Sequence, residues 1–228
     1  MEAIFSRLEL MLGKATLDAV ADARVAVFGV GGVGSWCAES LVRSGVRRMM
    51  LVDADRVCES NINRQLMATT QTVGEIKVVA LARRLREINP SVELELRPQI
   101  YAAATADAFD LSQFDYVIDA IDSLESKALL IRNALAIPSV TLFSSMGAAL
   151  KMDAAQIRHS DFRKVEGDGL ARALRQRFKR LGRHPARKFN VVCSTEPPAA
   201  LDVRASVMQV TAVFGLALAS EVIRALGE

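Results

Sequence analysis

Residues 24–34 read Arg-Val-Ala-Val-Phe-Gly-Val-Gly-Gly-Val-Gly, and this stretch decides the fold of the 228-residue chain. The apolar run that ends at Phe28 predicts a buried strand, and residues 35–42 predict a helix. A strand, a glycine turn and a helix in this order are the context in which the pattern G-x-G-x-x-G binds a phosphate. The pattern is filled by Gly29, Gly31 and Gly34, and Gly32 is a fourth glycine within it.

Each glycine of the pattern has its own physical use. Gly29 allows the tight turn, Gly31 lets the backbone approach a phosphate, and Gly34 lets the helix pack close to the strand. The free N–H groups and the dipole of the helix start attract the phosphate itself. A glycine turn that serves packing alone is the simpler alternative, and the motif leaves ATP and a dinucleotide equally open.

The composition indicates a folded domain with a sizeable core. The apolar fraction is 51% and the net charge is only +3, so a polyanionic partner needs a local basic patch. Cys37, Cys58 and Cys193 form no C-x-x-C pair, which argues against structural zinc and a disulfide framework and favours the reducing cytoplasm. We see no apolar run of the ~20 residues that a membrane span needs.

Strands and helices alternate along most of the chain. This alternation predicts an α/β fold with a doubly wound, mostly parallel, Rossmann-like sheet in a single domain over residues 1–228. Further strands are predicted at 49–52, 92–96, 114–119, 140–143 and 189–192, and helices at 3–21, 73–89, 124–135 and 207–226. The last helix is apolar, and we interpret it as a core or dimer helix. The loops expected to converge at the strand ends are 29–34, 53–65, 119–123 and 144–147.

A polar segment follows the second strand, beside the glycine loop. Asp53 lies nineteen residues beyond Gly34, where a carboxylate commonly accepts the two ribose hydroxyls, and the alternative is an Asp that only caps a turn. Further along, Asn61 and Arg64 could grip a triphosphate, since a guanidinium binds phosphate bidentately. This segment distinguishes the chain from an ordinary dehydrogenase.

Two charged residues have both a functional and a bland interpretation. Lys77 lies in the first turns of a predicted helix, where the helix dipole disfavours a cation; a phosphate partner would explain it, and a solvated lysine is the alternative. Asp122 follows a strand end and could hold Mg²⁺ together with triphosphate oxygens. The alternative is a helix N-cap, since Asp122 and Ser123 precede a helix.

Residues 163–188 form a basic insert within the domain. They contain ten Lys or Arg and two acidic residues, an excess of eight positive charges. A solvated helical face is one interpretation, and an anionic partner is the other. Such a partner would be bound by Arg175, Lys179 and Arg183. Cys193, beyond the insert, could be a nucleophile, although a buried thiol is the more common role.

The order and spacing of these motifs resemble the ubiquitin-activating-enzyme-like adenylating superfamily over residues 24–147. A narrower resemblance, over nearly the whole chain, is to the tRNA threonylcarbamoyladenosine dehydratases. The motifs that carry it are Phe5-Ser-Arg7, Val57-Cys58, Asn61-x-Asn-Arg-Gln65, Gly74-x-x-Lys77, Asp119-Ala-Ile-Asp122, Ser144-Ser-Met-Gly147 and Val191-Val-Cys-Ser-Thr-Glu196.

The resemblance implies ATP-dependent activation of a carboxylate with Mg²⁺, on tRNA that carries threonylcarbamoyladenosine. It implies that Asp53 binds ribose and that Asp122 binds Mg²⁺. Arg7, which alone would be taken for a surface charge, reaches the nucleotide of the partner subunit in a homodimer. We expect catalysis to depend on Arg64, Lys77 and Asp122, and ATP to be bound also by Gly29, Gly31, Gly32, Gly34, Asp55, Asn61 and Gln65.

The chain departs from the dehydratase pattern at two positions. Ile4 stands where an arginine often precedes the phenylalanine, and Ala149 replaces a frequent glycine. The alternatives are an adenylyltransferase for the C-terminal glycine of a sulfur-carrier or ubiquitin-like protein, an NAD-dependent oxidoreductase, and a non-catalytic tRNA-binding adaptor. The resemblance also leaves a sulfur- or electron-transfer protein partner open.

Overall fold

The structure is a computed structural model that describes residues 3–182, 184–203 and 205–227. Its strands are β1 (Arg24–Phe28), β2 (Arg48–Val52), β3 (Glu93–Arg97), β4 (Tyr116–Asp119), β5 (Thr141–Ser145), β6 (Ile157–Asp161) and β7 (Asn190–Ser194). Its helices are α1 (Ser6–Leu12), α2 (Lys14–Asp22), α3 (Gly34–Arg43), α4 (Lys77–Ile88), α5 (Leu124–Leu135), α6 (Gly169–Arg180) and α7 (Met208–Gly227). Short 3₁₀ turns occur at Ala3–Phe5, Glu59–Asn61, Ala106–Ala108, Leu111–Gln113, Ala154–Gln156 and Phe162–Lys164.

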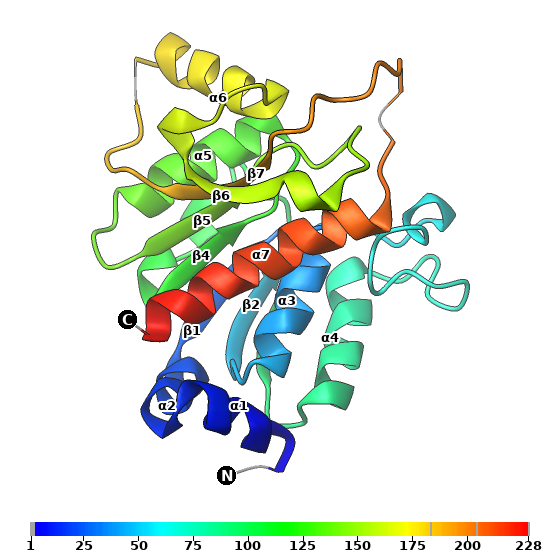
Figure 1. The fold of residues 1–228 in the computed structure, drawn as a ribbon, viewed down its shortest axis with the longest axis vertical. Coiled ribbons are helices and arrows are strands. Elements are labelled where there is room, and N and C mark those ends of the chain that lie inside the picture. The colour runs from blue at the N-terminus through cyan, green and yellow to red at the C-terminus, as the bar shows by residue number, and fades with distance from the viewer. Residues whose placement is uncertain (1–2, 183, 204, 228) are drawn as a thin grey trace.

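The seven strands form one sheet in the order β3-β2-β1-β4-β5-β7-β6 (Figure 1). Neighbouring strands are parallel except β6, which runs antiparallel to β7 at the edge. This confirms the predicted doubly wound, mostly parallel sheet. The strand order reverses direction between β1 and β4, which is where open α/β sheets bind ligands.

Helices cover both faces of the sheet and make two cores. Helices α3, α4 and α7 pack on one face, where Leu41, Leu81 and Phe214 are fully buried. Helices α5 and α6 pack on the other, with Leu130 and Phe178 fully buried. The parallel strands between the cores are buried on both faces, which explains why they are nearly continuous apolar runs in the sequence.

Helix α7 lies along α3 on the outside of the first core (Figure 1). It is the one helix in the described ranges that is long and apolar enough to cross a membrane, and half of its most apolar window is buried inside the protein. The two helices approach so closely that a Cβ at Gly215 would lie 2.3 Å from the carbonyl oxygen of Val33. Helix α7 is therefore a core helix, as predicted from its apolar pattern.

Three predicted elements differ from the structure. The predicted helix 3–21 is two helices, because Gly13 between them has a φ of +79°. The helix predicted at 73–89 begins at Lys77, since Gly74 has a φ of +90° and Ile76 forms an antiparallel bridge with Arg56. The edge strand β6 was not predicted, because its sequence Ile-Arg-His-Ser-Asp has no run of apolar residues.

Strands β2, β1, β4 and β5 are consecutive and parallel in the sheet. The loops that follow them therefore leave the sheet at the same edge. This confirms that the loops 29–34, 53–65, 119–123 and 144–147 converge.

Candidate functional site

Two glycines of the loop are required by packing, and a third is not. A Cβ at Gly34 would lie 1.8 Å from the carbonyl oxygen of Gly29, and one at Gly29 would lie 2.7 Å from the carbonyl oxygen of Ala120. Gly29 also has a φ of +83°. Around Gly31, in contrast, the nearest atom to such a Cβ is Nε2 of Gln65 at 3.7 Å. The protein itself leaves Gly31 room for a side chain, so packing does not account for this glycine.

The half-buried carboxylate of Asp53 lies against the glycine loop. Its two oxygens accept backbone N–H groups of Val30 and Asp55, each at 2.9 Å. Asp53 therefore does cap a turn, and that turn fixes its carboxylate beside the loop. Burial raises the pKa of Asp53 above its ordinary value, and the charge of Lys77 opposes that rise.

Lys77 is a buried cation, which excludes the solvated-lysine alternative. Its side chain is 7% exposed, and its Nζ lies 2.7 Å from Oδ2 of Asp55, whose side chain is 70% exposed. The backbone N–H of Lys77 donates to the carbonyl oxygen of Asp55 at 3.0 Å. Helix α4 therefore begins at the loop after β2, and its first side chain points into the site.

The segment 58–65 is held by its own side chains. Oδ1 of Asn61 accepts the N–H of Cys58 at 3.1 Å, which ties down a side chain predicted to hold phosphate. The Arg64 guanidinium donates to the carbonyl oxygen of Ser60 and to Oδ1 of Asn63, each at 2.9 Å. These bonds leave other guanidinium N–H groups of Arg64 available, because the group has five donors.

Gln65 carries an unsatisfied acceptor next to the glycine loop. Its side chain is 6% exposed, and its Oε1 is buried without a hydrogen-bond partner. Buried polar groups are normally hydrogen-bonded, so an orphaned oxygen here requires an explanation. A hydroxyl or amine of a bound ligand close to Gly31 would supply the missing donor.

The end of β4 has two carboxylates with opposite environments. Asp119 is fully buried and bonded to Lys127 and Ser144, which was not predicted from the sequence. Asp122 is exposed, and the N-cap of α5 is Ser123, which makes no side-chain capping bond. The helix-cap alternative for Asp122 is therefore wrong.

The donor set at this edge fits a magnesium ion that is completed by phosphate oxygens. Within residues 3–182, 184–203 and 205–227, no group of three or more His, Cys, Asp or Glu could hold a metal alone. Mg²⁺ in phosphate-binding enzymes commonly uses one or two carboxylates together with substrate phosphates and water. Asp122 supplies one such carboxylate, whereas the oxygens of Asp119 are committed inside the protein.

Several cations of the basic insert are engaged within the fold. Arg175 donates to the carbonyl oxygens of Phe162 and Val165, and its guanidinium lies 5.3 Å from the Phe162 ring centroid. Arg187 donates to four carbonyl oxygens at the end of α5 and in the turn after it. Arg163 and Arg177 pair with Asp161 and Glu125, respectively. The excess of positive charge is therefore partly used inside the protein.

Helix α6 presents the rest of the charge along one stripe. Its buried residues are Ala171, Leu174 and Phe178, and on the opposite side Arg172, Lys179 and Arg180 are exposed. Lys179 thus lies on a free surface, as expected, whereas Arg175 lies between the two faces. Arg183 lies outside the described residues.

The environments of Cys193 and Arg7 bear on their predicted roles. Cys193 is 2% exposed, and burial raises the pKa of its thiol, which disfavours the thiolate that a nucleophile requires. Arg7 is exposed on α1, whose neighbour Phe5 packs near Gly45 beyond the carboxyl end of α3. The glycine loop precedes the other end of α3, about 15 Å away along this ten-residue helix. Arg7 therefore points away from the site of its own chain.

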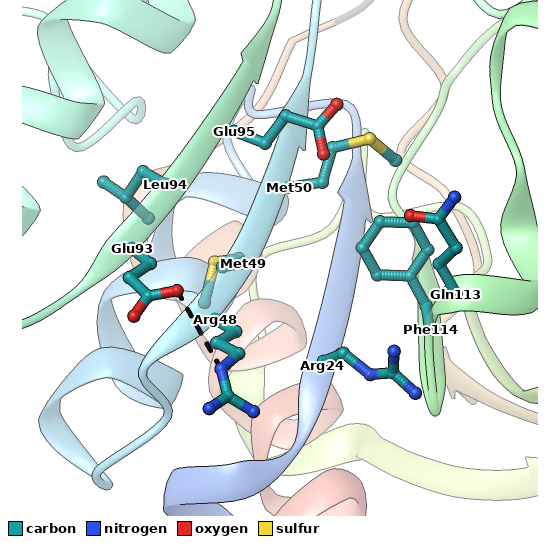
Figure 2. Close-up of a pocket in the computed structure, with 9 residues that line it drawn as sticks. All are labelled: Arg24, Arg48, Met49, Met50, Glu93, Leu94, Glu95, Gln113 and Phe114. Atoms are coloured by element: carbon teal, nitrogen blue, oxygen red, sulfur yellow. Dashed lines mark ion pairs between the residues drawn. The ribbon is translucent and has the colours of Figure 1, made fainter.

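A hollow of about 340 Å³ lies elsewhere on the sheet, at the amino ends of β1, β2 and β3 (Figure 2). Arg24 and Arg48 are paired in register there. Arg48 lies 3.9 Å from Glu93, and Arg24 lies 3.7 Å from Asp115, so both charges are already matched by carboxylates. The hollow is separate from the four converging loops.

Comparisons with known proteins agree with this geometry. The family model of the ThiF family matches residues 5–228. The tRNA threonylcarbamoyladenosine dehydratase of Bacillus subtilis is 40% identical over 205 residues, which are 89% of this chain and 80% of that protein. The Escherichia coli dehydratase is also 40% identical, over 74% of this chain and 63% of that protein.

A solved structure gives the same result in three dimensions. The crystal structure of the Escherichia coli tRNA N6-threonylcarbamoyladenosine dehydratase in complex with AMP has a TM-score of 0.91. It is 34% identical and covers 97% of this chain and 93% of its own. The same enzyme has been solved in complex with ATP. The chain belongs to the ThiF family and, within it, to the tRNA threonylcarbamoyladenosine dehydratases.

Proposed function

We propose that this chain catalyses the ATP-dependent dehydration of threonylcarbamoyladenosine in tRNA. The carboxylate of the modified nucleoside attacks the α-phosphorus of ATP, and pyrophosphate leaves. A nucleophile within the same nucleoside then attacks the acyl-adenylate, a ring closes and AMP leaves with the oxygen that is lost. The reaction needs no nucleophile from the enzyme, in agreement with the buried thiol of Cys193.

The observation that carries this proposal is the buried cation of Lys77 beside the glycine loop and Asp53. In the proposed complex, Asp53 accepts the ribose hydroxyls, and the amides around Gly31 approach a phosphate. Lys77 and Arg64 neutralise the charge that develops as pyrophosphate leaves. The orphaned Oε1 of Gln65 accepts from the nucleotide.

The remaining predicted ATP contacts have narrower roles. Asp55 holds Lys77 in place, and Asn61 shapes the segment that presents Arg64. Gly32 keeps the loop thin where a Cβ would lie 3.3 Å from side-chain atoms of Arg64 and Thr211. Asp122 would hold Mg²⁺, which supplies charge neutralisation of the phosphates when bound.

We assign tRNA binding to the stripe Arg172, Lys179 and Arg180 on α6. These exposed cations have no acidic partner within the described residues, unlike Arg163 and Arg177. Arg175 supports the helix from behind, since its guanidinium is bonded to two backbone carbonyls. RNA phosphates are the anions that such a stripe fits.

A homodimer completes the site in this proposal. Arg7 lies too far from the glycine loop of its own chain, so it can act only on the nucleotide of a second copy. The helix that carries it exposes Leu10 and Met11, which are 88% and 83% exposed in the single chain. Large exposed apolar side chains of this kind are typical of an interface.

The test is mass spectrometry of nucleosides from tRNA incubated with the protein, ATP and Mg²⁺. Loss of one water from threonylcarbamoyladenosine supports the proposal. An unchanged nucleoside together with adenylation of a sulfur-carrier protein would instead favour the adenylyltransferase alternative. The sulfur carrier protein adenylyltransferase of Thermus thermophilus is 35% identical over only 54% of this chain.

A further inference from the structure

A buried ion pair lies beneath the loops of the proposed nucleotide site. Nζ of Lys127 on α5 lies 2.7 Å from Oδ2 of Asp119 at the end of β4, and both side chains have no exposed surface. The hydroxyl of Ser144 on β5 donates to the same oxygen at 2.6 Å. Charges are rarely buried this completely, and a buried pair does not by itself indicate a gain in stability.

The other oxygen of Asp119 holds the turn that follows β4. Oδ1 accepts the backbone N–H of Ile121 at 3.2 Å. The carboxylate thus has its two oxygens divided between two tasks. Lys127 and Ser144 fix Oδ2, and this orientation presents Oδ1 to the amide of Ile121, the residue immediately before Asp122.

This turn is in direct backbone contact with the glycine loop. The N–H of Ala120 donates to the carbonyl oxygen of Phe28 at 2.8 Å, and Gly29 approaches Ala120 too closely for a Cβ. A shift of the turn therefore moves Asp122 relative to the loop that approaches the phosphates. The position of Asp122 depends on Asp119, because Asp122 itself makes no side-chain capping bond at the start of α5.

We propose that Lys127 and Ser144 are positioning residues that act through Asp119 on the carboxylate of Asp122. This inference rests on the proposed function, because it takes Asp122 as the magnesium ligand. Groups that hold a metal ligand in place commonly matter for metal affinity, by about 10- to 100-fold. Lys127 has this role here because a neutral side chain cannot fix an ionised, buried carboxylate in one orientation.

The experiment compares variants that remove the network with one that removes the ligand. Ser144→Ala removes one donor to Asp119, and the double variant Asp119→Asn/Lys127→Met removes the network without leaving an unpaired buried charge. Asp122→Asn is the reference. Ser126→Ala is the matched control, because Ser126 is a buried serine adjacent to Lys127 with no assigned role.

The measurement is the dissociation constant of ATP for the full chain by calorimetry, with Mg²⁺ and with EDTA. We expect Ser144→Ala and the double variant to bind ATP normally in EDTA. They should lose about tenfold of the affinity that Mg²⁺ adds. In the Asp122→Asn background, Ser144→Ala should have no further effect, since both act on the same ligand. Melting temperatures check the fold, and Ser144→Ala suffices if the double variant does not fold.

Two results would overturn the inference, and they are distinguishable. If Asp122→Asn loses the affinity that Mg²⁺ adds while both network variants keep it, the ion pair is only structural. If Asp122→Asn itself keeps that affinity, Asp122 is not the magnesium ligand, and the failure lies in the proposed function.

Discussion

Lys77 Nζ and Asp55 Oδ2 are 2.7 Å apart, with the lysine almost fully buried and the aspartate largely exposed. The pair keeps a cation inside the site before a nucleotide binds. Because Asp55 is solvated, phosphate oxygens can replace it beside Lys77 without leaving a buried carboxylate unpaired. This exchange is what a site for a triphosphate requires.

We expect Lys77→Ala and Arg64→Ala to keep the fold and to lose adenylation by about 10²-fold or more, because each removes a cation from the pyrophosphate charge. The measurement is ATP–pyrophosphate exchange in the presence of the modified tRNA. Arg86→Ala is the control, since Arg86 is exposed near the other end of α4. Wild-type exchange in both site variants would show that the phosphates bind elsewhere.

The affinity for ATP should depend on the protonation of Asp53. Ribose hydroxyls donate to the ionised carboxylate, and burial raises the pKa of Asp53 above 3.8. Affinity is therefore complete above this raised pKa and is lost as the pH falls through it. Calorimetry at several pH values should show this loss in the wild type and not in Asp53→Asn, which binds weakly throughout. Identical pH profiles for the two proteins would contradict the assignment.

Binding of tRNA should weaken when charge is removed from α6. We expect Arg172→Ala/Lys179→Ala to lower the affinity and to flatten its salt dependence by roughly 0.7 to 0.9 log units per lost contact. ATP affinity should not change. The control is Lys14→Ala/Arg86→Ala, which removes the same net charge from α2 and α4. Filter binding at several salt concentrations decides, and equal slopes for the two double variants would reduce the stripe to a solvated face.

Arg7 should act on the site of the partner subunit. Arg7→Ala and Lys77→Ala should each be inactive alone. A mixture allowed to exchange subunits should regain activity, because one site of each mixed dimer then has an intact Lys77 and an intact Arg7. An inactive mixture in which mass spectrometry detects mixed dimers would place Arg7 in its own chain's site or outside any site.

The close contact of α7 with α3 gives a stability prediction. Gly215→Ala should destabilise the protein by roughly 1–3 kcal/mol, because its Cβ would overlap the backbone of α3. Gly169→Ala, at the first position of α6, meets no atom within 4 Å and should stabilise by roughly 0.4–1 kcal/mol. Urea unfolding measures both changes, and a neutral Gly215→Ala would mean that the two helices can separate without cost.

The sequence by itself determined the order of strands and helices and the loops that bind at their ends. Local rules suffice for this, because buried parallel strands are continuous apolar runs and a glycine turn before a helix has one common use. They are weaker at boundaries, and α4 began later than predicted because the backbone at Gly74 and the bridge from Arg56 to Ile76 prevent an earlier start. The dinucleotide and ATP interpretations could be separated only by family resemblance.

Only the tertiary structure decided which charges are available. Asp119 and Asp122 are three residues apart and chemically identical, yet one is neutralised by Lys127 and the other faces solvent. In the same way, Arg175 and Lys179 are one helical turn apart, and only the first is bonded to backbone carbonyls. The physical reason is that burial and pairing depend on residues distant in the chain, which the folded sheet brings within hydrogen-bonding distance.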